Sequence, residues 1–494
     1  MSRFKLASLL AFVVLVGSTP MHGADELPPH PESIDYGELS FEPPVRKRFR
    51  DTLPNGVVLY LLQDRSLPLI DVSFTFSGGS YLDPVGQEGL ASLTGAMMRR
   101  GGTTSGSPED FDEQADFLAA EISAGIGDES ASAGLNSITM NFDASFAMFL
   151  DMLRNPGFDE ERFGTLKAEV IEGMKQRNDN ADSILAAEWS SLLYGEGHHE
   201  ARRATLASIE SISIDDMREF HGRIFHPGNL VIGITGDFEV GTMHRTLEKA
   251  LEGWEAGARP DKPAAPSHEF TPGVYFVEKD IPQGKVAIGM RGVKRDHPDW
   301  IPLRVMNLIL GGGGFTSRIT NKVRTEEGLA YSAGSRMSPA YHYPGEFRAF
   351  FQSKSSTCAL ATQLILDEVE RIRETPVTAE ELEVAKASVI ETFPRAFESK
   401  KSIRDLFVNE EWRPHDDDYF AKYRDRVRSI TAADIQRVAR EHLDPSQMMI
   451  LVVGDWTEIA PGDLEGRAKM DDFFGGEATE LPLRDPLTLE PISP

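Results

Sequence analysis

The 494-residue chain contains a single cysteine, Cys358. One cysteine cannot form an internal disulfide, and no cluster of cysteine and histidine residues is present that would build a structural zinc site. Basic residues are also scarce, since 51 Lys and Arg stand against 78 Asp and Glu and leave a formal net charge of −27. A chain this acidic repels phosphate backbones, so we expect no binding to nucleic acid. Cys358 has no signature of a nucleophile and is expected to be buried or inert.

The apolar run at residues 6–16 is too short for a membrane-spanning helix, which needs roughly 20 apolar residues. It follows Arg3 and Lys5 and is followed by small residues up to Ala24, which is the pattern of a cleaved secretory signal. We therefore predict a signal peptide over residues 1–24 and no other contact with a membrane. A eukaryotic secreted chain of this size would be expected to carry disulfides, so the lone cysteine favours a secreted protein in the periplasm of a Gram-negative bacterium.

What the chain does contain is an internal repeat. Two segments, 167–172 and 211–217, recur about 218 residues later as 386–391 and 429–435. With 40% hydrophobic and 26% charged residues, the composition is that of a globular protein with real cores. The chain is therefore predicted to consist of two copies of one α/β unit of roughly 210 residues.

The repeat and the proline-rich stretches around it predict the domain boundaries. In chain order we predict a signal peptide, an extended arm, a first α/β domain, a linker, a second α/β domain and a tail: 1–24, 25–46, 47–256, 257–273, 274–469 and 470–494. The arm and the tail are both rich in proline and acidic residues, so each is either a flexible end or a strap that lies on a partner.

Each copy shows the same order of elements, in which a pair of strands precedes a helix that ends at glycines and an apolar strand closes the copy. The predicted elements are the strands 57–61, 72–76, 230–234, 274–277, 286–290 and 448–453, and the helices 89–99 and 300–310. Later helices begin at capping boxes, namely Ser213-x-x-Asp216, Thr378-x-x-Glu381 and Thr431-x-x-Asp434. This mixture predicts an α+β fold of two homologous α/β sandwich domains in tandem, which together form half of a clam-shell chamber.

Several short motifs occur in a fixed order along residues 47–470. They are Leu53-Pro54-Asn55-Gly56, Gly78-Gly79-Ser80, Gly89-Leu90-Ala91 and His226-Pro227 in the first copy, and Leu310-Gly311-Gly312-Gly313-Gly314-Phe315, Ser317-Arg318 and Glu327-Gly328-Leu329-Ala330-Tyr331 in the second. In this order the motifs resemble the pitrilysin/insulinase-type zinc peptidases, above all the half-length chains such as those of mitochondrial processing peptidase. The resemblance implies a chamber of four such domains, and therefore of two chains.

The catalytic members of that family carry H-x-x-E-H on the first helix, where two histidines hold zinc and the glutamate activates water. At the matching positions this chain has Ser92, Gly95 and Ala96, and the motif occurs nowhere else in the sequence. Spacing alone would place the family's third ligand at Glu169, but alignment of that helix places it at 164–166, where there is no carboxylate. We interpret Glu169 as a helix-surface charge. We therefore expect no metal in this chain and no peptide hydrolysis by it alone.

The second copy retains the residues with which the family binds substrate. The resemblance implies that Arg324 and Tyr331 face the zinc across the chamber, bind the substrate backbone and stabilise the oxyanion. Both are hydrogen-bond donors suited to a carbonyl that gains negative charge. Four glycines precede this pair: Gly311, Gly312, Gly313 and Gly314. They are either the stop and turn after a helix or, as in the non-catalytic subunit of the mitochondrial enzyme, a loop that touches substrate.

The sequence His198-His199-Glu200 has the composition of a metal cluster. It falls where the resembled family has a loop, with Arg202 in register, so we predict an exposed loop without metal.

Together these residues predict a non-catalytic, substrate-binding subunit of a heterodimeric periplasmic zinc metalloprotease. The expected partner is a catalytic insulinase-like chain with an intact H-x-x-E-H that holds the zinc, and the expected substrate is a peptide or an unfolded protein. The negative charge suits basic, presequence-like peptides, although it also serves solubility. Two alternatives stay open: a scaffold or assembly protein with no substrate role, and a stand-alone protein that binds extended peptides by strand addition.

Overall fold

The computed structural model describes residues 40–492. By its contacts the chain divides into two units, residues 1–41 and 42–494, and the account below concerns the second unit. The predicted signal peptide and residues 25–39 of the predicted arm lie outside the described residues. Within residues 40–492, no helix combines the length and the apolar character needed to cross a membrane.

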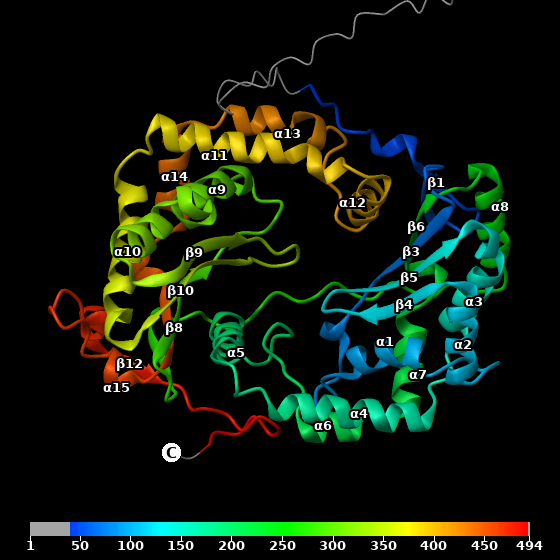
Figure 1. Cartoon of the computed structure of the whole chain (residues 1–494), viewed down its shortest axis with the longest axis horizontal. Helices are drawn as coiled ribbons and strands as arrows, with labels where there is room; N and C mark the ends of the chain where they lie inside the picture. Colours follow the sequence, from blue (N-terminus) through cyan, green and yellow to red (C-terminus); the bar gives the residue numbers. More distant parts are fainter. Residues whose placement is uncertain (1–39, 493–494) are drawn as a thin grey trace, which may run out of the picture. The chain divides into compact units, whose positions relative to one another are not determined.

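Two six-stranded mixed sheets form the framework, and they have the same strand order (Figure 1). In sheet order the first is β1 (Arg50–Thr52), β2 (Val58–Gln63), β6 (Leu230–Gly236), β3 (Leu69–Ser77), β5 (Ser130–Ile138) and β4 (Glu121–Ile126). The second is β12 (Ala478–Glu480), β7 (Gly273–Glu278), β11 (Met449–Gly454), β8 (Gln283–Arg291), β10 (Glu346–Lys354) and β9 (Ala330–Ser338). In both sheets the second and third strands are parallel and the next pairs are antiparallel. The predicted α+β fold with two related domains is confirmed.

The first sheet buries one face against helices because its strands alternate apolar and polar residues. Along β3 the even positions Ile70, Val72, Phe74 and Phe76 are buried, and the positions between them are only partly buried. The helices that contribute to this core are α1 (Leu90–Arg100), α2 (Pro108–Leu118), α3 (Phe142–Arg154), α4 (Glu160–Lys175), α6 (Leu206–Ser211), α7 (Ile214–Ile224) and α8 (Val240–Ala250). On β3 and β5 the opposite face of the sheet carries mainly small polar side chains.

The second sheet is covered in the same way. Its helices are α9 (Trp300–Asn307), α10 (Cys358–Glu374), α11 (Ala379–Thr392), α13 (Tyr419–Arg428), α14 (Ala432–His442) and α15 (Trp456–Ile459). Cys358 is fully buried in this core, and burial raises the pKa of its thiol to about 12, so it is an inert core residue as expected. The three predicted capping boxes are all formed.

The helix predicted over residues 300–310 is a regular α-helix only in its first part. Regular α-helix ends at Asn307, and the chain continues as a π-helical turn, Leu308–Gly312. The cause is close packing, because Gly311 lies against the backbone of β9: a Cβ there would be 2.5 Å from the Ser335 nitrogen. The helix therefore does not end at the first glycine but continues to Gly312 as a wider π-helical turn.

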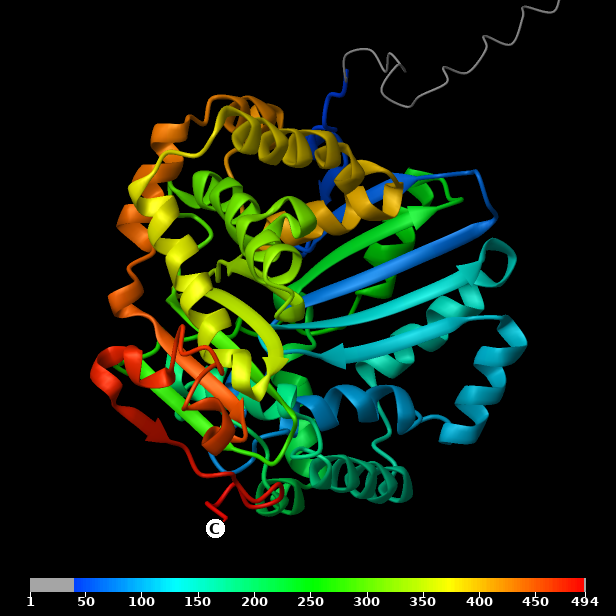
Figure 2. The same cartoon turned by 60° about the vertical axis from the view of Figure 1, so that its left-hand side comes forward.

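Each half contributes one helix that packs on the sheet of the other half. Helix α5 (Ala181–Tyr194) follows α4 but packs on β8 and β11 of the second sheet, where Trp189 is buried. Helix α12 (Lys400–Trp412) follows α11 but packs on β6 and β2 of the first sheet, with the Phe407 and Tyr60 rings 6.0 Å apart. Figures 1 and 2 show α12 beside the first sheet. The two helices occupy equivalent places in the repeat, so the exchange is reciprocal.

The C-terminal segment also joins the halves. After β12, the Leu481 N–H donates to the Phe276 carbonyl of the second sheet (2.7 Å). Further on, Arg484 pairs with Glu188 of α5, and the Leu487 carbonyl accepts from the N–H of Leu206 at 2.8 Å. The segment predicted as a free tail or a strap on a partner thus lies on this chain itself.

Candidate functional site

Helix α1 carries the three positions that correspond to the zinc motif. Ser92 is exposed and Ala96 is partly buried, and neither side chain can ligate zinc in the manner of histidine. Gly95 is buried against the edge of the first sheet, where a Cβ would lie 2.6 Å from the Ile126 nitrogen and 3.0 Å from the Gly125 backbone. The position of the catalytic glutamate has therefore lost its carboxylate and also the room for one.

Glu169 on α4 is held in an ion pair on the surface. Both of its oxygens accept from the Arg100 guanidinium, at 2.8 and 3.1 Å, and the side chain is 51% exposed. These hydrogen bonds lower the pKa of Glu169. It is the helix-surface charge that the sequence predicted. Within residues 40–492, the one group of three side chains placed to share a metal ion does not include any residue of α1 or α4.

Arg324 and Tyr331 are brought together in an exposed aromatic stack. Arg324 lies on a π-helical turn, Thr320–Glu326, and Tyr331 lies on β9. The guanidinium carbon is 4.7 Å from the centre of the Tyr331 ring and 4.5 Å from that of Phe315, a residue the sequence interpretation did not single out. Tyr331 is 84% and Phe315 is 65% exposed. We call these three residues the arginine stack.

The arginine stack leaves the donors of Arg324 available. The guanidinium carbon lies over both rings, which is a cation–π arrangement. None of the hydrogen bonds or ion pairs found among residues 40–492 uses Arg324. Among the described residues its donors are therefore unpaired, which suits a carbonyl, a carboxylate or a developing oxyanion.

The four glycines have distinct surroundings. A Cβ at Gly311 would lie 2.4 Å from the Ser335 hydroxyl, one at Gly312 would lie 2.6 Å from the Asn307 amide, and one at Gly313 would lie 2.5 Å from the Leu308 carbonyl oxygen. Gly314 has φ +60° and open space around it. Packing thus accounts for three of the four glycines, and the fourth provides the turn that places Phe315 in the arginine stack.

A pocket of about 340 Å³ adjoins the arginine stack and shares Phe315 with it. Its apolar wall comes from Leu308, Ile309, Val384 and Ala385. An ion pair forms part of its border, in which Nε and Nη2 of the buried Arg318 donate to Glu381 at 2.7 and 2.9 Å. The pocket offers space for an apolar side chain next to the free donors of Arg324.

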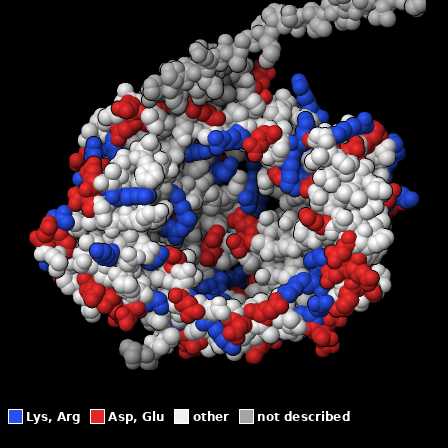
Figure 3. All heavy atoms as spheres, viewed as in Figure 1, with Lys and Arg blue, Asp and Glu red and all other residues white. Residues whose placement is uncertain are grey.

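A larger cavity, of about 830 Å³, lies on the polar face of the first sheet under α12. The sheet contributes mainly small polar side chains, among them Ser73, Thr75, Ser132 and Asn136, and α12 contributes Arg404. In Figure 3, side chains of both signs surround the hollow on this face of the molecule. Such a surface can hydrogen-bond an extended polypeptide without selecting one side chain.

The loop with His198 and His199 packs against a tyrosine of the second half. The Tyr343 hydroxyl donates to Glu200 (2.6 Å) and lies 3.1 Å from Nε2 of His199, and Tyr343 is 1% exposed. Burial lowers the pKa of His199 to about 4, so the ring is neutral near pH 7. Both histidines are partly buried, so the predicted loop is less exposed than its sequence indicated.

Part of the sequence matches a known protein family. Residues 211–389 match the family profile described as "Peptidase M16 inactive domain". This part of the chain is therefore similar to the M16 peptidases, which agrees with the resemblance to the zinc peptidases.

Named relatives agree with this assignment. The chain is 25% identical to "Non-peptidase homolog YmxG" of Helicobacter pylori over 67% of its own length and 76% of the relative. Among solved structures, a peptidase M16 inactive domain from Pseudomonas fluorescens superposes with a TM-score of 0.73 at 23% identity, over 82% of this chain and 97% of that one. The periplasmic protease PqqL from Escherichia coli gives a TM-score of 0.68 at 14% identity, over 82% of this chain and 46% of PqqL.

We expect Gly95→Ala to destabilise the chain by about 1–3 kcal/mol, because even a methyl group would overlap the backbone of β4. Gly164→Ala on α4 is the matched control, since a Cβ there has no atom within 4 Å and alanine is the better helix former. Urea unfolding followed by circular dichroism measures both. Equal stability of Gly95→Ala and the wild type would contradict the view that α1 has closed on the sheet.

We expect the Arg318–Glu381 ion pair to stop contributing to the stability of the chain at acid pH. Burial alone would raise the pKa of Glu381, but hydrogen bonds from Arg318 and from the Thr378 backbone lower this pKa to about 2. The unfolded pKa is about 4.3, so the stabilisation, about 3 kcal/mol, is complete above that pH and is lost as the pH falls towards and below 2. Urea unfolding of the wild type and Glu381→Gln should differ at pH 6 and converge near pH 2. Glu380→Gln, at the exposed neighbouring residue, is the control and should track the wild type; a difference between the wild type and Glu381→Gln that is independent of pH would contradict this assignment.

Proposed function

We propose that the chain is the non-catalytic, substrate-binding subunit of a two-chain M16 zinc metalloprotease in the bacterial periplasm. The partner would be a catalytic chain with an intact H-x-x-E-H that holds the zinc, and peptides would be cut in the chamber between the two chains. The observation that carries the proposal is the contrast between the two halves. The base position is closed at Gly95, whereas Arg324 keeps its donors free at the surface.

In this proposal each member of the arginine stack has a defined task. The Arg324 fork and the Tyr331 hydroxyl donate to carbonyl oxygens of the bound peptide, and these bonds strengthen as the scissile carbonyl gains negative charge. Phe315 holds the guanidinium plane by stacking, so the donors are aimed before substrate arrives. The partner's zinc would supply the activated water.

The substrate in this proposal is an extended peptide or an unfolded protein. The polar cavity under α12 supports it, because its serine, threonine and asparagine side chains can bind any backbone. The net charge of −27 favours basic peptides through faster encounter. A periplasmic location is supported by the signal-like sequence of residues 1–24, and the structural neighbour PqqL is described as a periplasmic protease.

Reconstitution tests the proposal. The chain is mixed with an M16 chain of the same bacterium that retains H-x-x-E-H, and hydrolysis of a quenched fluorescent basic peptide is followed for each chain alone and for the mixture. We expect this chain alone to be inactive and the mixture to exceed the partner alone by at least about tenfold, since each chain holds half of the catalytic groups.

Other outcomes decide between functions. Full activity of the partner without this chain would refute the proposal. If the mixture is active but Arg324→Ala leaves it unchanged, the chain is a scaffold. If the isolated chain binds the peptide tightly and no catalytic partner associates with it, the chain is a stand-alone peptide binder.

A further inference from the structure

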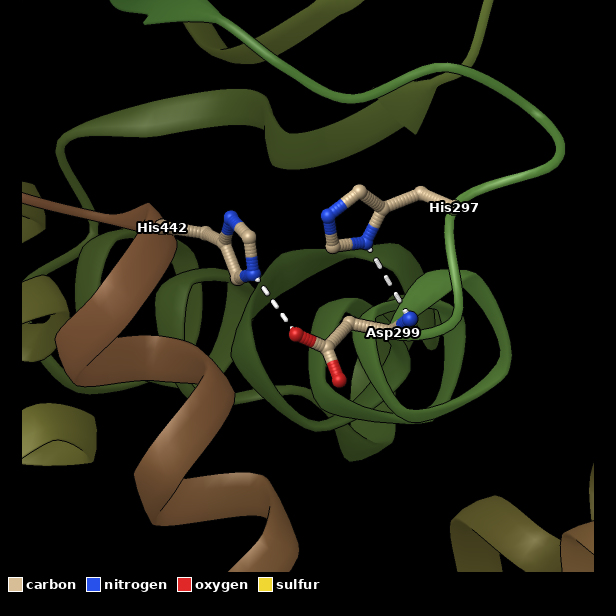
Figure 4. A group of neighbouring side chains, drawn as sticks. All are labelled: His297, Asp299 and His442. Carbon is tan, nitrogen blue, oxygen red and sulfur yellow. Dashed lines mark hydrogen bonds and ion pairs between the residues drawn. The ribbon is translucent and has the colours of Figure 1, made fainter.

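Two histidines and an aspartate meet on the helical layer of the second half, away from α1 and from the arginine stack. Asp299 immediately precedes α9, His297 lies two residues earlier, and His442 is the last residue of α14 (Figure 4). One ligand atom of each lies within 4.8 Å of the other two. The imidazole rings are 5.2 Å apart and nearly perpendicular, at 88°. All three side chains are partly buried, so the group is fixed but reachable from solvent.

We propose that His297, Asp299 and His442 bind one divalent transition-metal ion, of which zinc fits the donor set best. Two imidazoles and one carboxylate are ligands that zinc accepts in tetrahedral sites, with water in the fourth position. Donors around tetrahedral zinc are roughly 3.4 Å apart, so the three side chains need to close in by about 1 Å. A shift of that size requires rotation about side-chain bonds only, because α9 and α14 already hold the three residues together.

In the hydrogen bonds of this group, a proton shared by His442 and Asp299 takes the place that a metal ion would occupy. The Nε2 atom of His442 lies 2.9 Å from Oδ2 of Asp299, the pair of atoms between which the ion would sit. The Nδ1 atom of His297 accepts the Asp299 N–H at 3.1 Å. Binding therefore displaces the proton between His442 and Asp299.

Arg437 has the position of an outer residue that orients a metal-binding carboxylate. It donates to Oδ1 of Asp299 at 2.7 Å and to Oδ2 at 3.1 Å, and it also donates to Glu441 at 2.8 Å. It can release Oδ2 to the ion and stay paired with Oδ1 and Glu441.

This site modifies one expectation from the sequence, which was that the chain holds no metal. An ion here would join the start of α9 to the end of α14, and it would have no part in peptide hydrolysis. One zinc per purified chain would therefore not indicate a working inverted motif at Ser92, Gly95 and Ala96. The inference is independent of the proposed function, because neither the arginine stack nor a partner is involved.

Titration with metal alone tests the inference. The full chain is dialysed against a chelator, then titrated with Co²⁺ by visible absorption and with Zn²⁺ by calorimetry. We expect one ion per chain, with the intense visible bands of tetrahedral Co²⁺ and competition by Zn²⁺. His297→Ala and His442→Ala should each weaken binding by at least about 100-fold, and Arg437→Lys by about 10-fold. Near-UV circular dichroism confirms that each variant is folded.

His415→Ala is the matched control. His415 also pairs with a carboxylate, Glu410, at 2.8 Å, but no second histidine completes that pair. This variant should bind the ion as the wild type does. Absence of stoichiometric binding in the wild type, or binding that survives both His297→Ala and His442→Ala, would overturn the inference. If Asp299→Asn alone abolishes folding, the two histidine variants still decide.

Discussion

Arg324→Ala is expected to lower kcat of the reconstituted two-chain protease by about 10²–10³, the cost of removing one donor from an oxyanion site. The guanidinium carbon lies 4.5 and 4.7 Å from the ring centres of Phe315 and Tyr331 and the group has no other partner among the residues described, so its donors are free for substrate. The chain's stability should change little, because the side chain makes no ion pair within residues 40–492. Steady-state hydrolysis of a fluorescent peptide measures the effect.

Three further variants separate the tasks within the arginine stack. Arg324→Lys keeps the charge but loses the planar fork and the stacking, so it should recover little activity. Tyr331→Phe removes only the hydroxyl, and it should lower kcat if that hydroxyl donates to substrate. Phe315→Leu should mainly raise KM, because the fork is then less well aimed. Arg428→Ala, an exposed arginine paired only with Asp425 three residues earlier, is the control. Equal activity of Arg324→Ala and Arg428→Ala would refute the proposed role.

Arg404→Ala is expected to destabilise the chain by about 3–5 kcal/mol, because it breaks a buried ion pair from one side. Only 2% of the Arg404 side chain is exposed. Its Nη1 donates to the Asp71 carboxylate of β3 and, at 3.0 Å, to the Asp71 carbonyl. Its stem lies on Gly233 of β6, where a Cβ would be 2.7 Å away. The residue thus fastens α12 of the second half to the first sheet.

Lys401→Ala is the control for this prediction. Lys401 binds the same Asp71 carboxylate at 2.8 Å, but 58% of its side chain is exposed. Solvent screens such a pair, so we expect a loss below about 1 kcal/mol. Urea unfolding at pH 7 gives both values. A loss for Arg404→Ala no larger than that for Lys401→Ala would show that α12 is held by its apolar contacts alone.

The local structure followed from local sequence. The strand predicted over 72–76 is part of β3, and three Ser/Thr-x-x-Asp/Glu patterns predicted helix starts that the structure contains. These features depend on neighbours within a few residues, which is why a single sequence reveals them. The repeat predicted two related domains because similar segments fold alike, and the absence of histidine at Ser92 and Ala96 led to the expectation that the zinc site of the resembled family is missing.

Contacts between segments far apart in the sequence could not be predicted from such local patterns. No local pattern indicates that α5 and α12 pack on each other's sheets, since an amphipathic helix has the same apolar face whichever sheet it covers. Nor did the sequence connect Phe315 with Arg324, or His297 with His442, 145 residues away.

The sequence by itself predicted several strands and helix starts, the two-fold repeat, the resemblance to the zinc peptidases and the absence of histidine at Ser92 and Ala96, because each follows from residue identity and short spacing. Only the tertiary structure decided that Gly95 closes the old base position, that three of the four glycines serve packing, and that Arg324 is held by two rings with its donors free. These properties depend on distances between side chains that the chain brings together only when its two halves have folded against each other.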